Sequence, residues 1–109
     1  MPNYVSEAQS FIDSHKFVQF SASWCPDCVY ASSIWAQYRV SDKVHVFDIG
    51  SMSKEEQEQW ITAYHQIANI RNLPTIFVEG KVWGTESELH GFENNGTLRE
   101  ELTKIGLLD

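Results

Sequence analysis

The chain carries both of its cysteines in one short run, Trp24-Cys25-Pro26-Asp27-Cys28. The apolar residues 17–22 before this run are typical of a strand, and residues 29–38 after it contain neither Gly nor Pro and are typical of a helix. A Cys-x-x-Cys pair at a strand-to-helix junction is the usual arrangement of a thiol–disulfide redox site. We therefore predict that these two cysteines form and break disulfides.

Size and composition limit the number of domains, the partners and the compartment that this chain can be expected to have. A chain of 109 residues with 42% hydrophobic and 13% aromatic residues is expected to form one globular domain over 1–109. Its net charge of -7 disfavours nucleic acid and anionic membranes as partners. No apolar run reaches the roughly 18–20 residues of a membrane span, and residues 1–17 do not read as a signal peptide. We expect a reducing compartment, the cytoplasm, and no membrane association.

Apolar spacing outward from the cysteine run predicts the other elements. Helices are expected over residues 4–14, 26–38 and 54–68, and strands over 17–22, 44–49 and 75–78. Glu79-Gly80 then turns the chain into a hairpin strand over 81–83. Two short helices follow: a capping box of Thr85 and Glu88 opens the first, and Thr97 and Glu100 begin the second.

This order of elements predicts an α/β fold with a central four-stranded mixed sheet flanked by helices. Strands that alternate with helices form a parallel pair, and the late hairpin adds antiparallel strands at one side. Right-handed crossovers would put strand 17–22 in the interior of the sheet, with helices on both faces. The two cysteines would then follow the carboxyl end of a central strand, where such sheets usually hold their sites.

With these elements, the chain resembles the thioredoxin superfamily over nearly its whole length. Two motifs support the resemblance: Trp24-Cys25-Pro26-Asp27-Cys28, and Leu73-Pro74-Thr75 ahead of the third strand. The resemblance implies a thioredoxin-like fold in which the peptide bond before Pro74 is cis and Pro74 packs beside the cysteines.

Within that superfamily the signals divide. Trp24 and residues 71–75 are similar to thioredoxins, but Gln19 stands where thioredoxins carry a buried acid. Pro26 and the stretch 81–89 are similar to glutaredoxins, in which the corresponding loop holds the γ-glutamyl carboxylate of glutathione on helix N-terminal N–H groups. The chain is identified as a divergent dithiol glutaredoxin with a C-P-D-C site.

This resemblance implies glutathione as co-substrate, with no tightly bound cofactor and no metal. The residues expected to contact glutathione or substrate are Trp24, Pro26, Asp27, Arg71, Leu73, Pro74, Ser87 and Glu88. Arg71 would hold the glycine carboxylate. Two positions depart from the family pattern, because Ala22 replaces a usual Lys and Ser87 replaces the loop Asp. Glutathione should therefore bind more weakly than in typical members.

The two cysteines are expected to have different roles. Cys25, exposed at a helix N-terminus whose dipole and free N–H groups favour a thiolate, would attack the substrate disulfide. Cys28 would resolve the mixed disulfide from inside the helix, unless a second glutathione does so. The negative charge of Asp27 opposes the Cys25 thiolate, so we expect low activity.

Three functions remain open from the sequence. The first is a glutathione-dependent reductase of protein disulfides or glutathione mixed disulfides. The second is a thioredoxin-like reductase of the C-P-D-C type, itself reduced by thioredoxin reductase, and the third is a low-turnover binding module of the same fold. A structural zinc site is disfavoured because zinc needs four ligands and the four histidines show no paired spacing. We expect a monomer.

Overall fold

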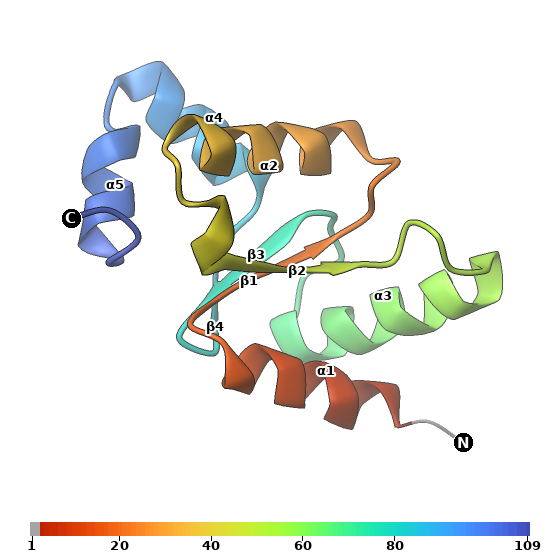
Figure 1. Ribbon diagram of the computed structural model, residues 1–109. Helices are drawn as coiled ribbons and strands as arrows, with labels where there is room; N and C mark the ends of the chain where they lie inside the picture. The colour runs from red at the N-terminus through yellow and green to blue at the C-terminus, as the bar shows by residue number, and fades with distance from the viewer. Residues whose placement is uncertain (1–2) are drawn as a thin grey trace.

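The structure is a computed structural model that describes residues 3–109 (Figure 1). The first two residues of the expected domain lie outside the described residues. The elements are α1 (Tyr4–Ser14), β1 (Phe17–Ser21), α2 (Pro26–Gln37), the short 3-10 helix η1 (Ser41–Lys43), β2 (Val44–Asp48), α3 (Lys54–Ala68), β3 (Thr75–Val78), β4 (Lys81–Gly84), α4 (Glu86–Asn95) and α5 (Leu98–Lys104). Most predicted bounds agree to within one residue, and the connector before β2 forms η1.

The strands form one mixed sheet in the order β2-β1-β3-β4. Strand β1 pairs with β2 in parallel, in a register that sets Phe17 opposite Val44 and Ser21 opposite Asp48. On its other side β1 pairs antiparallel with β3, and β4 completes the hairpin with β3. The predicted thioredoxin-like arrangement, with its first strand in the interior, is confirmed.

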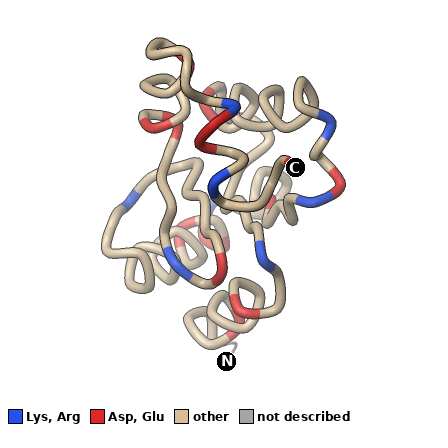
Figure 2. The backbone as a smooth tube through the Cα atoms, turned by 90° about the vertical axis from the view of Figure 1, so that its left-hand side faces the viewer, with Lys and Arg blue, Asp and Glu red and all other residues tan. Residues whose placement is uncertain are grey.

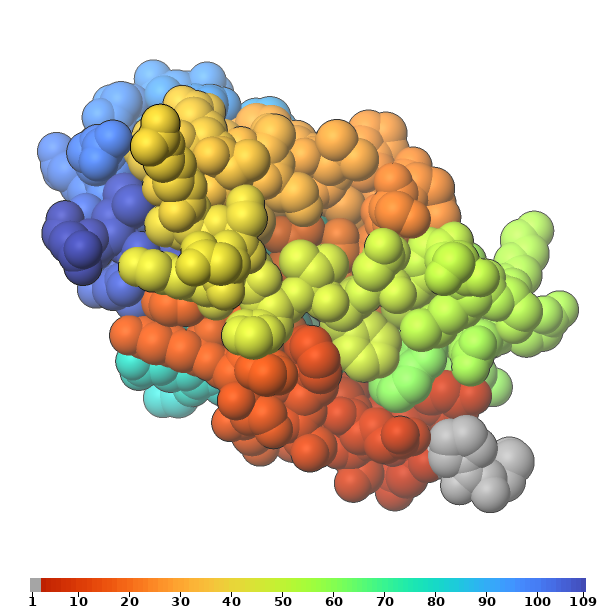
Figure 3. Space-filling view, viewed as in Figure 1, coloured from red at the N-terminus to blue at the C-terminus, as the bar shows by residue number. Residues whose placement is uncertain are grey.

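Helices cover both faces of this sheet (Figure 1). Helices α1 and α3 lie on one face, and α2, α4 and α5 lie on the other. In the space-filling view, residues of β2 come to the surface between these two helix layers (Figure 3). Strand β1 lies between β2 and β3 and is covered by helices on both faces, so every residue of β1 is buried, including the polar Gln19 and Ser21. Side chains alternate along a strand, so Gln19 and Ser21 share one face of β1.

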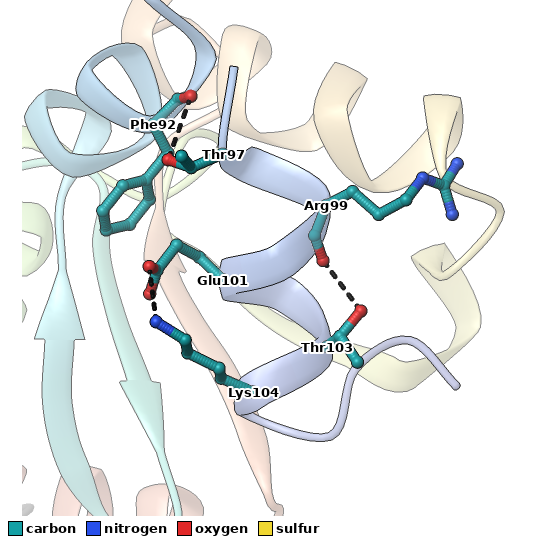
Figure 4. A network of polar contacts seen from close by, with 6 residues as sticks. All are labelled: Phe92, Thr97, Arg99, Glu101, Thr103 and Lys104. Carbon is teal, nitrogen blue, oxygen red and sulfur yellow. Dashed lines mark hydrogen bonds and ion pairs between the residues drawn. The ribbon is translucent and has the colours of Figure 1, made fainter. Parts of the chain in front are cut away.

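The last two helices begin as predicted but are capped differently. Thr85 forms the expected capping box at the start of α4, together with Glu88. Thr97 precedes α5, but its hydroxyl donates to the carbonyl of Phe92, 3.5 Å away, instead of capping the helix (Figure 4). Helix α5 is stabilised along its length by other contacts, such as the Lys104–Glu101 ion pair at 3.1 Å (Figure 4).

Charged residues lie mainly along the helices and connecting turns (Figure 2). Within residues 3–109, none of the helices combines the length and the apolar character that a membrane crossing requires.

Candidate active site

The two cysteines lie at the start of α2, directly after the carboxyl end of β1. Cys25 is the N-cap residue of α2, and Pro26 takes the first helical position, where its missing N–H leaves no hydrogen bond unmade. The amino ends of α2 and α3 lie on the same side of the molecule as the carboxyl ends of β1 and β2 (Figure 1). The predicted placement of the two cysteines, after the carboxyl end of an interior strand, is thus confirmed.

Cys25 is less accessible than expected. Only 7% of its surface is exposed, so the prediction of an exposed thiol is wrong. The loop before β3 is the reason: Cys25 Sγ lies 3.6 Å from the carbonyl oxygen of Leu73 and donates to it. The Leu73–Pro74 peptide bond is cis, and Pro74 is buried, as the resemblance implied. A substrate disulfide must therefore approach Cys25 past this loop.

Asn72 connects this loop to helix α4, a role that the sequence did not reveal. Its side-chain nitrogen Nδ2 donates to the carbonyl of Pro74 at 2.9 Å and to Glu86 Oε1 at 2.7 Å. Its carbonyl accepts from the Thr75 hydroxyl at 2.8 Å. An Asn that bonds backbone two residues further on is typical of tight turns, which is the signal that could have identified it. Asn72 thereby brings the N-terminus of α4 beside the loop that touches Cys25.

Cys28 lies deeper, with 2% of its surface exposed. Burial raises the pKa of its thiol from 9.0 to about 12. Hydrogen bonds from the Ser21 hydroxyl and the Ala22 backbone act in the opposite direction, because they stabilise the thiolate. Cys28 therefore holds its proton at neutral pH, which suits a resolving thiol that reacts second.

Trp24 lies at the surface beside Cys25, with 57% of its surface exposed. Its indole nitrogen donates to Gln57 Oε1 on α3 at 3.2 Å. Gln57 is itself held by a hydrogen bond to the Met52 carbonyl at 2.8 Å, so this contact orients the ring. Pro26 and Asp27 are exposed next to it. These three side chains form an exposed surface beside Cys25, and the sequence did not indicate the supporting role of Gln57.

Arg71, the expected partner of the glycine carboxylate, already has a partner. Its guanidinium forms an ion pair and hydrogen bond with Glu58 of α3, and both side chains are largely solvent-exposed. Ala22, which replaces the usual Lys, is fully buried. The Arg71 cation is thus balanced by a carboxylate of the chain itself.

The N-terminus of α4, expected to receive the γ-glutamyl carboxylate, is also partly occupied. Glu88 Oε1 accepts from the Thr85 backbone N–H at 2.7 Å, and the Thr85 hydroxyl accepts from the Ser87 N–H at 3.2 Å. Glu88 packs directly over Gly84, where a β-carbon would come within 2.8 Å of its side chain. Ser87 and Glu88 are exposed, but the Ser87 N–H and the Glu88 carboxylate are already engaged in the capping of the helix.

Three of the four histidines, His15, His45 and His90, pack against other rings. His15 and His45 stack at 3.8 Å between ring centroids, and His90 stacks on Tyr30 at 4.0 Å. In the part of the chain that the structure describes, no group of three or more His, Cys, Asp and Glu side chains is placed to hold a metal ion.

Comparison with known proteins gives a consistent result. The family model named Glutaredoxin matches residues 17–83. Glutaredoxin-8 of Saccharomyces cerevisiae is 61% identical over 108 residues, which are 99% of each chain. Glutaredoxin-C4 of Arabidopsis thaliana is 33% identical over 98 residues, which cover 86% of this chain and 64% of that protein.

The solved structures agree. The solution structure of a yeast dithiol glutaredoxin superposes with a TM-score of 0.90 at 60% identity, and the match covers the whole of both chains. A buckwheat glutaredoxin–glutathione complex has a TM-score of 0.75 at 22% identity, which shows a common fold. It covers 97% of this chain and 93% of that one. The chain therefore belongs to the glutaredoxin family of thiol–disulfide oxidoreductases.

Proposed function

We propose that this glutaredoxin reduces protein disulfides and glutathione mixed disulfides, that glutathione is its reductant, and that its activity is low. The observation behind this proposal is the placement of Cys25 under the Leu73–Pro74 loop, with Cys28 one turn further along α2. This geometry suits a disulfide that lies along the loop, with one sulfur in line with Cys25.

The chemistry follows from the two positions. The Cys25 thiolate attacks one sulfur of the substrate disulfide, and the other sulfur leaves as a thiolate that takes up a proton. With a glutathione mixed disulfide, Cys25 keeps the glutathione until a second glutathione thiolate attacks it and releases oxidised glutathione. With a protein disulfide, Cys28 attacks the Cys25 sulfur and releases the reduced protein.

Weak binding of glutathione is the part of the proposal that concerns this chain in particular. Glutathione carries two carboxylates, and Glu58 and Glu88 already satisfy the groups that should receive them. A third carboxylate, Asp27, is exposed beside Cys25. An incoming carboxylate must displace these groups or be repelled by them, which costs affinity.

A coupled assay with glutathione, glutathione reductase and NADPH tests this proposal. We expect Glu58→Gln and Glu88→Gln each to lower the KM for glutathione about threefold, because each removes one competing charge at the surface. Glu55→Gln, an exposed position on α3 in no described ion pair, is the matched control and should leave the KM unchanged. Equal KM values for all four proteins would contradict the proposed weakening.

The same preparations distinguish the competing functions. The exposed Trp24 beside a C-P-D-C site favours a thioredoxin-like reductase as the second candidate, and turnover with thioredoxin reductase but not with glutathione would establish it. Inactivity in both systems would leave a binding module. The same proposal includes a cytoplasmic location, since a dithiol site needs surroundings that keep it reduced. It also includes a monomeric state. Size-exclusion chromatography and imaging of the tagged protein test them.

A further inference from the structure

Gln19 lies fully buried in the middle of β1, on the face toward α2. Its Oε1 atom lies 2.6 Å from the indole nitrogen of Trp35. An indole N–H can only donate, so the atom that faces Trp35 must be the amide oxygen. The orientation of the Gln19 amide is therefore determined by its neighbour, and its NH2 group must point the other way, toward the start of α2.

The NH2 group of Gln19 meets three acceptors. Nε2 lies 3.1 Å from Ser21 Oγ, 3.3 Å from Ser32 Oγ and 3.4 Å from the carbonyl oxygen of Cys28. Ser21 is also buried, and its hydroxyl accepts from Gln19. The hydroxyl proton of Ser21 is then free to be donated. Ser21 and Cys28 line the same small hollow, and a hydrogen bond from Ser21 acts to lower the pKa of the Cys28 thiol.

We propose that Gln19 and Ser21 are positioning residues for the resolving step, as links in a line of donors that runs from Trp35 through Gln19 and Ser21 to the Cys28 sulfur. The line stabilises the Cys28 thiolate as it forms. Gln19 orients the Ser21 hydroxyl, and Ser21 makes the contact with the sulfur. This role depends on the dithiol chemistry of the site and is independent of whether glutathione is the reductant.

The balance of the step shows where the stabilisation acts. Cys28 gives its proton to solvent and attacks the Cys25 sulfur of the mixed disulfide. The Cys25–Cys28 bond forms, the bond between Cys25 and the substrate breaks, and the substrate thiolate leaves with the electron pair and takes a proton from solvent. Over the attacking and resolving steps together, the two cysteines are oxidised by two electrons and the substrate disulfide is reduced by two.

A small hollow next to Cys28 provides a path to solvent for the proton that the Cys28 thiol loses. Its volume is about 230 Å³, and it lies between α2 and β2, with Ser21, Cys28, Ser32 and Asp48 among its lining residues. Gln19 is neutral and has no lone pair basic enough to hold the proton, so the line of donors stabilises the anion without acting as a base. The rate of the resolving step should therefore follow the ionisation of Cys28 itself.

The reactions of Cys25 and Cys28 can be followed separately with dithiobisnitrobenzoate, an aromatic disulfide. Attack by Cys25 releases one coloured aromatic thiolate from this reagent, and resolution by Cys28 releases a second one. We expect Ser21→Ala to slow the second release about three- to tenfold and to move its pH midpoint upward. Loss of a hydrogen bond to the anion lowers the thiolate fraction, while the remaining thiolate gains some nucleophilicity. The first release should be unchanged.

Matched variants separate this role from simple packing. Ser32→Ala removes a hydroxyl that bonds the same Gln19 nitrogen but is not a described partner of the sulfur, so both releases should keep wild-type rates. Ser21→Thr keeps the hydroxyl and should restore the second release. Gln19→Met, which preserves volume, is the second test of the line and should again slow only the second release. The proposal is overturned if Ser21→Ala leaves the second release unchanged, if it slows both releases equally, or if Ser32→Ala matches it.

Discussion

At the scale of single residues, Cys25 and Cys28 differ in what surrounds their sulfurs. Cys25 faces the Leu73 carbonyl, an acceptor that a substrate must displace. Cys28 faces donors from β1 and is removed from solvent, which raises its pKa to about 12. In the proposed mechanism, the first thiol is adjacent to the loop along which the substrate lies, and the second reacts only with a sulfur that Cys25 has already bound.

Replacement of Cys28 tests this division of roles. Cys28→Ser should retain most of the activity toward a small glutathione mixed disulfide, because a second glutathione can release Cys25. It should lose nearly all reduction of a protein disulfide, which needs intramolecular resolution. Both reactions can be measured in the same coupled assay. Equal loss in both would show that Cys28 is needed for glutathione mixed disulfides as well.

The charge of Asp27 should slow the attacking thiol. Asp27→Asn removes an exposed negative charge two residues after Cys25, and we expect alkylation of Cys25 by iodoacetamide to become about two- to fivefold faster at neutral pH. Asp42→Asn, at an exposed position in η1, is the charge-matched control and should react like wild type. An unchanged rate for Asp27→Asn would show that solvent screens this charge completely.

At the scale of elements, α4 and α5 show why one sequence pattern gives two results. Both begin with Thr-x-x-Glu, but the backbone at Thr85 is extended, with φ -127° and ψ -167°. At Thr97 the values are -112° and 7°. An N-cap side chain reaches the helix N–H groups from an extended backbone. The tight turn between α4 and α5 prevents that conformation at Thr97.

Matched alanine substitutions should reproduce this difference. Thr85→Ala removes the side chain that caps α4 and should lower the free energy of unfolding by about 1 kcal/mol. Thr97→Ala removes only a long hydrogen bond to the Phe92 carbonyl and should cost roughly half as much or less. Urea unfolding followed by circular dichroism measures both. Equal losses would mean that Thr97 caps α5 in solution.

At the scale of the whole molecule, the packing of the helices buries the Cys28 and Tyr64 side chains and partly buries that of Tyr30. Burial raises the pKa values of Cys28 and Tyr30 to about 12, with a further contribution from Glu93 at Tyr30, and it also raises that of Tyr64. In the unfolded chain these groups ionise nearer their ordinary values of 9.0 and 10.0. Above about pH 9 the unfolded state therefore binds fewer protons than the folded state.

Stability should accordingly fall as pH rises through this window. Cys28 alone should account for about 1 kcal/mol of lost stability at about pH 10. Thermal unfolding between about pH 8 and pH 11 should show a falling Tm. Tyr64→Phe keeps the ring that stacks on Phe20 at 3.9 Å and should make the fall less steep. A Tm that stays level across this range would contradict the proposed burial of these groups.

The sequence by itself determined the elements and the place of the cysteines. Apolar spacing, Pro26 and the cysteine pair act within one or two turns of chain, so local pattern was enough to predict the elements and to place the cysteines after β1. The interior place of β1 followed from the order of the elements and the handedness of their crossovers. The cis peptide bond before Pro74 also followed from a local motif that matches a known family.

Only the tertiary structure decided which side chains are free to act. The loop at Leu73 covers Cys25, and Glu58 forms an ion pair with Arg71. Asn72 donates a hydrogen bond to Glu86, and Gln19 accepts one from Trp35. Each contact joins residues that are far apart in the chain and adjacent only after the sheet and helices have packed. Hydrogen bonds depend on distances of a few tenths of an ångström and on donor direction, and no spacing in the sequence encodes those quantities.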